Sequence, residues 1–155
     1  MRPAAADEIA AVADLFREYA ASLGVDLSYQ GFDAELAGLP GAYAPPDGAL
    51  LVAAAPDQEL LGCVAVRPLR TSGECEMKRL YVRPAARGTG AGAALAMAAI
   101  DTATGAGYRA MRLDTLGSMV SAQALYRRLG FELTAPYYET PVARTIFMRK
   151  ILRIA

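Results

Sequence analysis

The chain has 155 residues, 54% of them hydrophobic, and its 16 basic and 16 acidic residues balance to zero net charge. We expect a single domain over residues 1–155, and the balanced charge excludes a surface that attracts nucleic acid or an anionic membrane as a whole. Because the chain has no histidine and only two cysteines, Cys63 and Cys75, histidine-based catalysis and four-cysteine or imidazole zinc sites are excluded, and we expect no metal.

The N-terminal part of the sequence predicts an amphipathic helix followed by a covering segment. Hydrophobic residues recur at spacings of three and four over residues 9–23, which is typical of a helix with one buried face. Asp7 is the expected N-cap, and Gly24 marks the end. Residues 25–48 are rich in proline and glycine, so we expect a loop or lid with a short helix at residues 33–39.

The middle of the chain predicts three strands, a glycine-rich loop and a helix. Residues 49–54 and 60–67 flank a short segment of turn-forming residues, so they should pair as an antiparallel hairpin. A third strand is expected at residues 74–82. It leads into the glycine-rich loop, residues 83–92, and then into an alanine-rich helix that ends near residue 103.

The C-terminal part predicts a parallel strand, a helix and two final strands. Residues 109–115 alternate hydrophobic and polar side chains, and the helical crossover before them should place this strand parallel to the preceding one. A helix at residues 118–129 should end at Gly130, which suits a helix C-terminus. The last strands are expected at residues 131–133 and 145–152.

The strand at residues 74–82 departs from simple alternation. Glu76 and Lys78 fall on one face, but Arg79 follows Lys78 directly. One of these two basic residues must therefore face the wrong side unless the strand contains a bulge. A bulge leaves backbone groups unpaired, so we expect an irregularity at this point of the sheet.

Two general features bear on where the protein works. No segment is apolar over the roughly 20 residues that a membrane span needs, and the N-terminus shows no signal-peptide pattern. Cys63 and Cys75 suit free thiols in a reducing compartment. We therefore expect a soluble, cytoplasmic protein.

The glycine-rich loop is a candidate anion site. Consecutive N–H groups in such a turn, at the positive end of a helix, bind an anion without any net positive charge. Gly88, Gly90 and Ala93 also fit a dinucleotide-binding pattern, with Asp114 about twenty residues later. We disfavour that interpretation because residues 83–87 separate the strand from the first glycine and the earlier strands form a hairpin.

Two segments resemble the GNAT superfamily of N-acetyltransferases. Arg87, Gly90 and Gly92 match the acetyl-CoA motif of that family, written Arg/Gln-x-x-Gly-x-Gly/Ala, and residues 122–131 resemble its later helix, which ends in Tyr-x-x-x-Gly-Phe. Met119 departs from the family, because many members carry an asparagine there. The resemblance implies an α/β fold (α+β) with a mixed, mostly antiparallel sheet, a splayed central strand pair and about four flanking helices.

The resemblance also implies acetyl-CoA as the acetyl donor. Loop N–H groups would bind the pyrophosphate of coenzyme A. The N–H of Leu80 or Val82 would hold the acetyl carbonyl and stabilise its developing oxyanion. The residues expected to bind the cofactor are Leu80, Tyr81, Val82, Arg87, Gly88, Thr89, Gly90, Ala91 and Gly92.

Glu76 and Tyr126 match catalytic positions of the family. An alkyl ammonium with a pKa of about 10.4 must lose a proton before it attacks a thioester, and Glu76 would assist directly or through water. The alternatives for Glu76 are a salt bridge with a basic residue or a counter-charge for the substrate's ammonium. Tyr126 would protonate the departing thiolate of coenzyme A.

The expected acceptor is a primary amine of a small molecule or peptide, acetylated by direct transfer in a ternary complex. Tyr29 and Phe32 in the covering segment, and Tyr137 and Tyr138 in a proline-bounded turn, are candidates for its pocket. We expect neither nucleic acid nor a membrane as partner, and a homodimer is compatible with the family.

Two other classes of protein compete with the transferase. One is a non-catalytic acyl-CoA-binding sensor domain, and the other is a dinucleotide-binding protein that uses the glycine-rich loop. Glu76 and Tyr126 would have no catalytic role in a sensor, so their presence favours the transferase.

Overall fold

A seven-stranded sheet organises the computed structural model, which describes residues 1–153. Its strand order is β1-β2-β3-β4-β5-β7-β6. The pair β4 and β5 is parallel, and every other neighbouring pair is antiparallel, which confirms the mixed, mostly antiparallel sheet. The strands are β1 (Arg2–Pro3), β2 (Ala49–Ala54), β3 (Leu60–Pro68), β4 (Glu74–Val82), β5 (Ala110–Leu116), β6 (Glu132–Leu133) and β7 (Thr145–Ile151).

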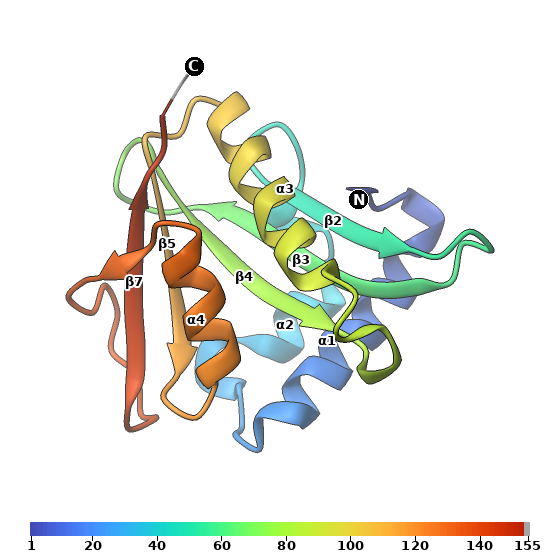
Figure 1. Cartoon of the computed structure of the whole chain (residues 1–155), viewed down its shortest axis with the longest axis horizontal. Coiled ribbons are helices and arrows are strands. Elements are labelled where there is room, and N and C mark those ends of the chain that lie inside the picture. Colours follow the sequence, from blue (N-terminus) through green and yellow to red (C-terminus); the bar gives the residue numbers. More distant parts are fainter. Residues whose placement is uncertain (154–155) are drawn as a thin grey trace.

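The helices cover both faces of this sheet, with α3 and α4 on one face and α1 and α2 on the other (Figure 1). The predicted helices are confirmed within a few residues at each end. Of the strands, only β1 had no counterpart in the sequence analysis, because two residues are too few to form a pattern. The helices are α1 (Ile9–Leu23), α2 (Phe32–Ala37), α3 (Ala91–Gly105) and α4 (Val120–Arg128).

The start of α1 differs from the prediction. Glu8, not Asp7, occupies the N-cap position, and no side chain caps the helix there. The chain enters α1 through a 3₁₀ turn, and the Glu8 carboxylate accepts hydrogen bonds from the Ala5 N–H and the Arg2 guanidinium, at 2.9 and 2.6 Å. This turn leaves Asp7 one position too early to act as the cap.

Each face of the sheet has its own hydrophobic core. On the α1 face, Phe16 packs with Leu27, Phe32 and Tyr43 against β2 and β3. The covering segment, residues 25–48, is thus anchored by buried side chains. On the opposite face, the alanines of α3 let this helix lie close to the sheet, and together with Leu95 they form much of the second core.

The predicted bulge lies in β4 at Arg79. Cys63 of β3 pairs with Tyr81, but Ala65 pairs with Lys78, so β4 carries one extra residue. Arg79 has a φ of 59°, a left-handed conformation that costs a non-glycine residue about 1–2 kcal/mol. The bulge points the Arg79 side chain toward α2, where Glu35 binds it through two hydrogen bonds of 2.9 and 3.1 Å.

The parallel strands β4 and β5 lie side by side only at their N-terminal ends. Their register pairs run from Glu74 and Ala110 to Glu76 and Arg112, and the pairing ends there. Beyond this point the two strands diverge, as Figure 1 shows, so the sheet opens into a V. This confirms the splayed central strand pair.

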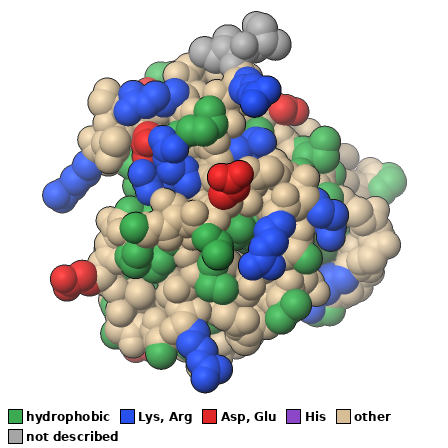
Figure 2. All heavy atoms as spheres, turned by 60° about the vertical axis from the view of Figure 1, so that its left-hand side comes forward, with side chains coloured by type: hydrophobic (Ala, Val, Ile, Leu, Met, Phe, Trp, Pro, Cys, Tyr) green, Lys and Arg blue, Asp and Glu red, His purple; other side chains and the backbone are tan. Residues whose placement is uncertain are grey.

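Charged side chains are unevenly distributed over the surface. In the upper part of the face shown in Figure 2, Lys and Arg side chains gather, although the whole chain has no net charge. Within residues 1–153, none of the helices combines the length and the apolar character that crossing a membrane requires.

The core predicts a clear contrast between two substitutions. Phe16 is 0% exposed, whereas Met97 on the outer face of α3 is 52% exposed. Phe16→Ala should therefore lower the free energy of unfolding by about 3–5 kcal/mol through lost burial and a residual cavity, whereas Met97→Ala should change it by less than about 0.5 kcal/mol. Urea denaturation of the two variants measures the difference. Equal values would contradict the assignment of Phe16 to the core.

Candidate active site

The glycine-rich loop ends where α3 begins. Gly88 and Gly90 both have left-handed backbones, with φ of 81° and 85°, and Gly90 is the N-cap residue of α3. No side chain caps this end among the described residues, so the first N–H groups of a fifteen-residue helix are available to an anion. A Cβ atom at either glycine would meet nothing within 4 Å, so the space next to the loop is open.

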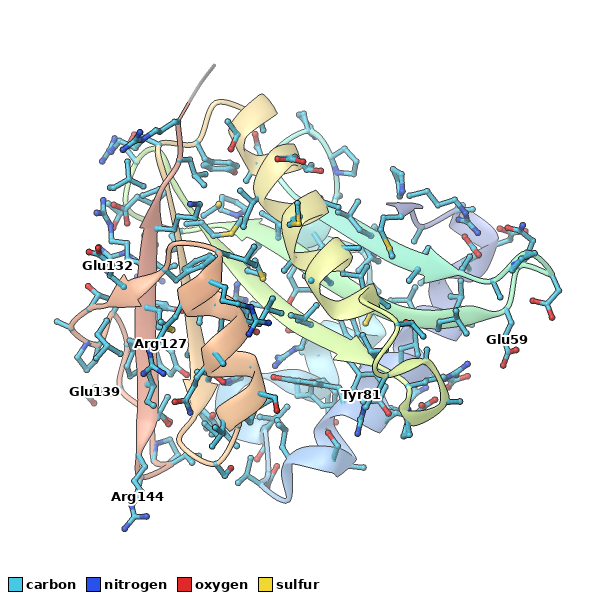
Figure 3. The ribbon with its side chains drawn as sticks, viewed as in Figure 1. Glu59, Tyr81, Arg127, Glu132, Glu139 and Arg144 are labelled. Carbon is cyan, nitrogen blue, oxygen red and sulfur yellow. The ribbon has the colours of Figure 1, made fainter. Side chains whose placement is uncertain are left out.

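An outer cleft of about 510 Å³ extends from this loop along the V. Arg87 is held at its edge, because its Nε donates a 3.0 Å hydrogen bond to the Val82 carbonyl. Figure 3 shows Tyr81 near the end of β4, whereas Arg127 lies on the side of α4 toward β7 and does not line the cleft. Leu80, Tyr81, Val82, Arg87 and Gly92 line the outer cleft, whereas Gly88, Thr89, Gly90 and Ala91 form the turn at its end.

Met119 and Ala122 line the opposite wall of the outer cleft. Met119 stands where the family often has asparagine, and its sulfur accepts a hydrogen bond of 3.7 Å from the Thr115 hydroxyl. A thioether is only a weak acceptor and donates no hydrogen bond. Any ligand contact at this position is therefore mainly apolar.

A narrow inner cleft, about 30 Å³ in volume, lies deeper between the diverging strands. Leu80 of the bulged strand, Asp114 of β5 and Tyr126 of α4 all line it. Three elements that are remote in sequence thus bring an unpaired strand edge, a carboxylate and a phenol to one place.

Tyr126 is buried at the inner cleft, with 7% of its surface exposed. Burial raises the pKa of its hydroxyl well above the ordinary value, because the phenolate would lose its hydration. The phenol therefore remains protonated at neutral pH and is available as a hydrogen-bond donor. Its ring packs edge-on against Phe131, with centroids 5.8 Å apart.

Glu76 lies outside the inner cleft and is only 1% exposed. Its Oε1 accepts a 2.8 Å hydrogen bond from Arg67 Nε, and its Oε2 accepts one from the Tyr137 hydroxyl. The Nζ atom of Lys78 lies 3.9 Å from Oε2. The salt-bridge alternative considered for Glu76 is thus present in the structure, and both carboxylate oxygens already have partners.

Asp114 is the acidic residue that lines the inner cleft together with Tyr126. Its Oδ2 accepts a 2.7 Å hydrogen bond from the Tyr138 hydroxyl, and its Oδ1 lies 3.7 Å from Lys78 Nζ. Sequence analysis considered Asp114 only within the dinucleotide pattern. The alternation of residues 109–115 was the available signal, since it places Asp114 on the same face of β5 as Arg112.

Lys78 is a buried cation beside these two acids. Burial lowers the pKa of its ammonium, although the charges of Asp114 and Glu76 oppose this shift. Its Nζ donates a 3.2 Å hydrogen bond to Gln30 Oε1, which also accepts from Arg79. This amide side chain is therefore a second link between the covering segment and β4, beside the Glu35–Arg79 pair.

Three of the four predicted pocket aromatics gather around these acids. Tyr137 donates to Glu76 and Tyr138 to Asp114, whereas Tyr29 lines the inner cleft and accepts from Gln30. Phe32 is different, because it lies in the hydrophobic core below Arg79, whose guanidinium carbon is 5.1 Å from its ring centroid.

An outer cavity of about 760 Å³ lies next to Glu76, on the far side of Tyr138 from the inner cleft. Arg67, Arg70 and Arg112 contribute three guanidinium groups to its wall, and Tyr137 and Tyr138 contribute aromatic surface. Glu76 is the carboxylate that lines it.

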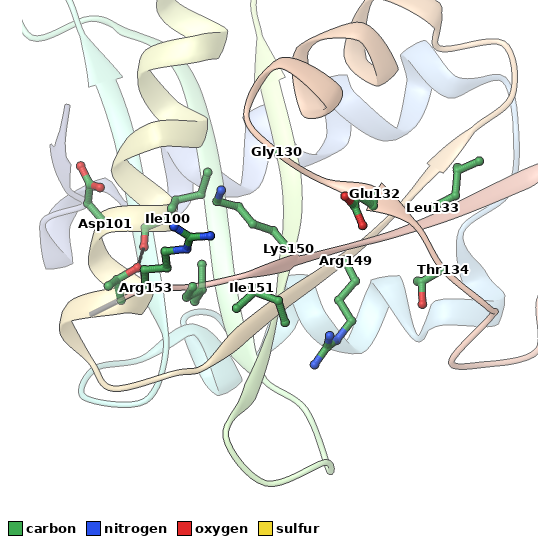
Figure 4. A pocket seen from close by; sticks show the side chains of 12 residues that line it. Ile100, Asp101, Gly130, Glu132, Leu133, Thr134, Arg149, Lys150, Ile151 and Arg153 are labelled. Carbon is green, nitrogen blue, oxygen red and sulfur yellow. Dashed lines mark hydrogen bonds between the residues drawn. The ribbon is translucent and has the colours of Figure 1, made fainter. Parts of the chain in front are cut away.

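A separate cavity of about 870 Å³ lies between α3, β6 and β7 (Figure 4). Asp101, Glu132, Arg149 and Lys150 are among its lining residues. These belong to parts of the chain other than the predicted site, and the charges are mixed. Size alone therefore does not identify the active site.

The two cysteines are packing residues. Both are buried free thiols, and burial raises the pKa of each well above its ordinary value. Cys63 donates a 3.4 Å hydrogen bond to the carbonyl of Arg79, where the bulge interrupts the regular ladder. Within residues 1–153, no group of three His, Cys, Asp or Glu side chains is arranged to hold a metal ion.

The sequence of the chain matches the model of a known family and the sequences of related proteins. Residues 10–131 match the model of the Acetyltransferase (GNAT) family. An uncharacterised N-acetyltransferase from Schizosaccharomyces pombe is 44% identical over 135 residues, which cover 87% of this chain and 83% of the relative.

Two solved structures are similar in fold. An acetyltransferase of the GNAT family from Staphylococcus aureus Mu50 has a TM-score of 0.80 and 17% identity, with 97% of each chain covered. A phosphinothricin acetyltransferase from Sinorhizobium meliloti, solved in complex with AcCoA, has a TM-score of 0.74 and 24% identity, covering 97% of this chain and 86% of the other.

Proposed function

The chain belongs to the acetyltransferase (GNAT) family, and we propose that it transfers the acetyl group of acetyl-CoA to a primary amine of a small molecule or peptide. The two substrates bind together, and the amine attacks the thioester directly. The opening between β4 and β5 supports this proposal most strongly. It connects the exposed start of α3 to an inner cleft that holds a phenol and a carboxylate.

Coenzyme A binds along the outer cleft in this proposal. Its pyrophosphate lies against the N–H groups of residues 88–92, where the helix dipole and the free N–H groups of α3 favour negative charge. Arg87 lies at the rim of the same cleft. The pantetheine arm follows the edge of β4 that β5 no longer covers, as far as the bulge.

The acetyl carbonyl is placed at this unpaired edge, where the N–H of Leu80 or Val82 stabilises the oxyanion of the tetrahedral intermediate. As the C–S bond breaks, the Tyr126 hydroxyl donates a hydrogen bond and then its proton to the sulfur. The raised pKa of Tyr126 keeps this proton in place until negative charge develops on the leaving thiolate.

Asp114 and Glu76 are the two carboxylates that could accept the proton of the acceptor's ammonium group. We assign this proton to Asp114, because Asp114 lines the inner cleft with Tyr126 and its side chain is 14% exposed, whereas Glu76 lies outside this cleft and its side chain is 1% exposed. Glu76 then acts as a counter-charge that holds Arg67 and Tyr137 in position. The family resemblance favours the opposite assignment, so the two roles need a direct comparison.

Gly90→Ala should weaken coenzyme A binding about tenfold or more, because the new methyl group enters the space next to the loop. Gly107→Ala is the matched control, since Gly107 also has a left-handed backbone, with φ of 93°, and open surroundings at the other end of α3. Titration calorimetry should show full affinity for the control. Equal losses in both variants would attribute the effect to backbone strain instead of ligand space.

Asp114→Asn should lower kcat/KM by about 10²–10⁴-fold at neutral pH, the usual range for acid–base catalysis. Activity should partly recover at high pH, where the acceptor is already deprotonated. Glu76→Gln is the matched comparison and should lose less, without this recovery. If instead Glu76→Gln shows the larger loss and the recovery, Glu76 is the base.

Tyr126→Phe should reduce kcat by about 10²-fold and leave the affinity for acetyl-CoA unchanged, because the proton moves only in the transition state. The kcat of Tyr126→Phe should fall less with thioesters of more acidic thiols, because these thiols leave as thiolates and need no proton. The control is Tyr43→Phe, which removes a buried hydroxyl that has no hydrogen-bond partner within the described residues. An identical dependence on thiol acidity in Tyr126→Phe and the unmodified enzyme would rule out the general acid.

A further inference from the structure

The inner cleft is too small to contain a whole acceptor molecule. Its volume of about 30 Å³ is small beside the roughly 300–1,000 Å³ of a small-molecule pocket. It therefore has room only for the reacting groups next to Asp114 and Tyr126. The remainder of any acceptor must lie in an adjoining space.

The outer cavity shares no lining residue with the inner cleft, and Tyr138 stands between them. Tyr138 lines the outer cavity, and its hydroxyl donates to Asp114 in the inner cleft. With about 760 Å³, the outer cavity has room for a small molecule. The amine of an acceptor bound there reaches Asp114 by taking the place of the Tyr138 hydroxyl on this carboxylate.

The charges of the outer cavity are unbalanced. Glu76 is neutralised by Arg67, and Arg112 is bound by Glu74 at 2.6 Å. Arg70, in the exposed turn between β3 and β4, forms no ion pair or hydrogen bond with any side chain in residues 1–153. One guanidinium group in the wall of the outer cavity thus has no counter-charge within the described chain.

We propose that the acceptor carries a carboxylate as well as its amine, and that Arg70 binds this carboxylate. The proposal rests on the amine acetylation proposed above. A guanidinium group matches a carboxylate through two parallel hydrogen bonds. A single free guanidinium suits one negative charge, whereas a phosphate monoester carries nearly two at neutral pH.

The test compares ω-amino acids with alkylamines of the same chain length, from two to six carbons, as acceptors for the full-length enzyme. Thiol release from acetyl-CoA gives kcat/KM for each compound. At the length that spans from Asp114 to Arg70, the amino acid should exceed its alkylamine by about tenfold or more. This advantage should shrink in high salt, because Arg70 is exposed.

In Arg70→Gln, kcat/KM for each ω-amino acid should fall to that of the alkylamine of the same chain length. Arg17→Gln is the control, since it removes another exposed guanidinium, from α1 and away from both cavities, and it should keep the advantage.

Two results would overturn the proposal in distinguishable ways. If alkylamines are acetylated but amino acids show no advantage at any length, or keep it in Arg70→Gln, the carboxylate site is wrong and amine acetylation stands. If neither series releases thiol, although calorimetry shows that acetyl-CoA binds, amine acetylation is contradicted and this proposal with it.

Discussion

The bulge in β4 is the constraint on which the rest of the site depends. It forces Arg79 into a left-handed backbone, a conformation that would relax if nothing held it. The paired hydrogen bonds to Glu35 and the third bond to Gln30 hold the side chain in place. Because the bulge interrupts the regular strand, β4 turns away from β5 and the clefts can form.

The part of the sheet where we propose that the acceptor binds contains a network of buried charges. Along β4, Glu76 pairs with Arg67, Lys78 lies near Asp114, and Arg79 pairs with Glu35, so neighbouring groups neutralise one another. Such pairs add little net stability, because desolvation offsets their attraction, but the loss of one partner is costly. Their value here is positional, because they fix where two carboxylates and one ammonium lie.

The two ends of the site are built in different ways. The proposed cofactor end is local, since residues 83–92 run as one segment through a 3₁₀ turn and past Gly88 and Gly90, which have positive φ, into the start of α3. The proposed acceptor end is assembled from β3, β4, β5, the covering segment and the loop that carries Tyr137 and Tyr138. Local sequence can encode the first, but the second requires the whole sheet to form.

Local sequence signals are enough to predict the order of the elements, the bounds of β4, a bulge at Lys78 and Arg79, and the glycine-rich loop before α3. Each follows from the spacing of hydrophobic residues or from the backbone freedom of glycine, which act over a few neighbours. The enclosure of Glu76 by Arg67 and Tyr137, and the place of Asp114 in the lining of the inner cleft, emerge only when the whole sheet is assembled. These contacts join residues as many as 61 positions apart, and their partners are set by strand register and by the divergence of β4 from β5, which no local pattern records.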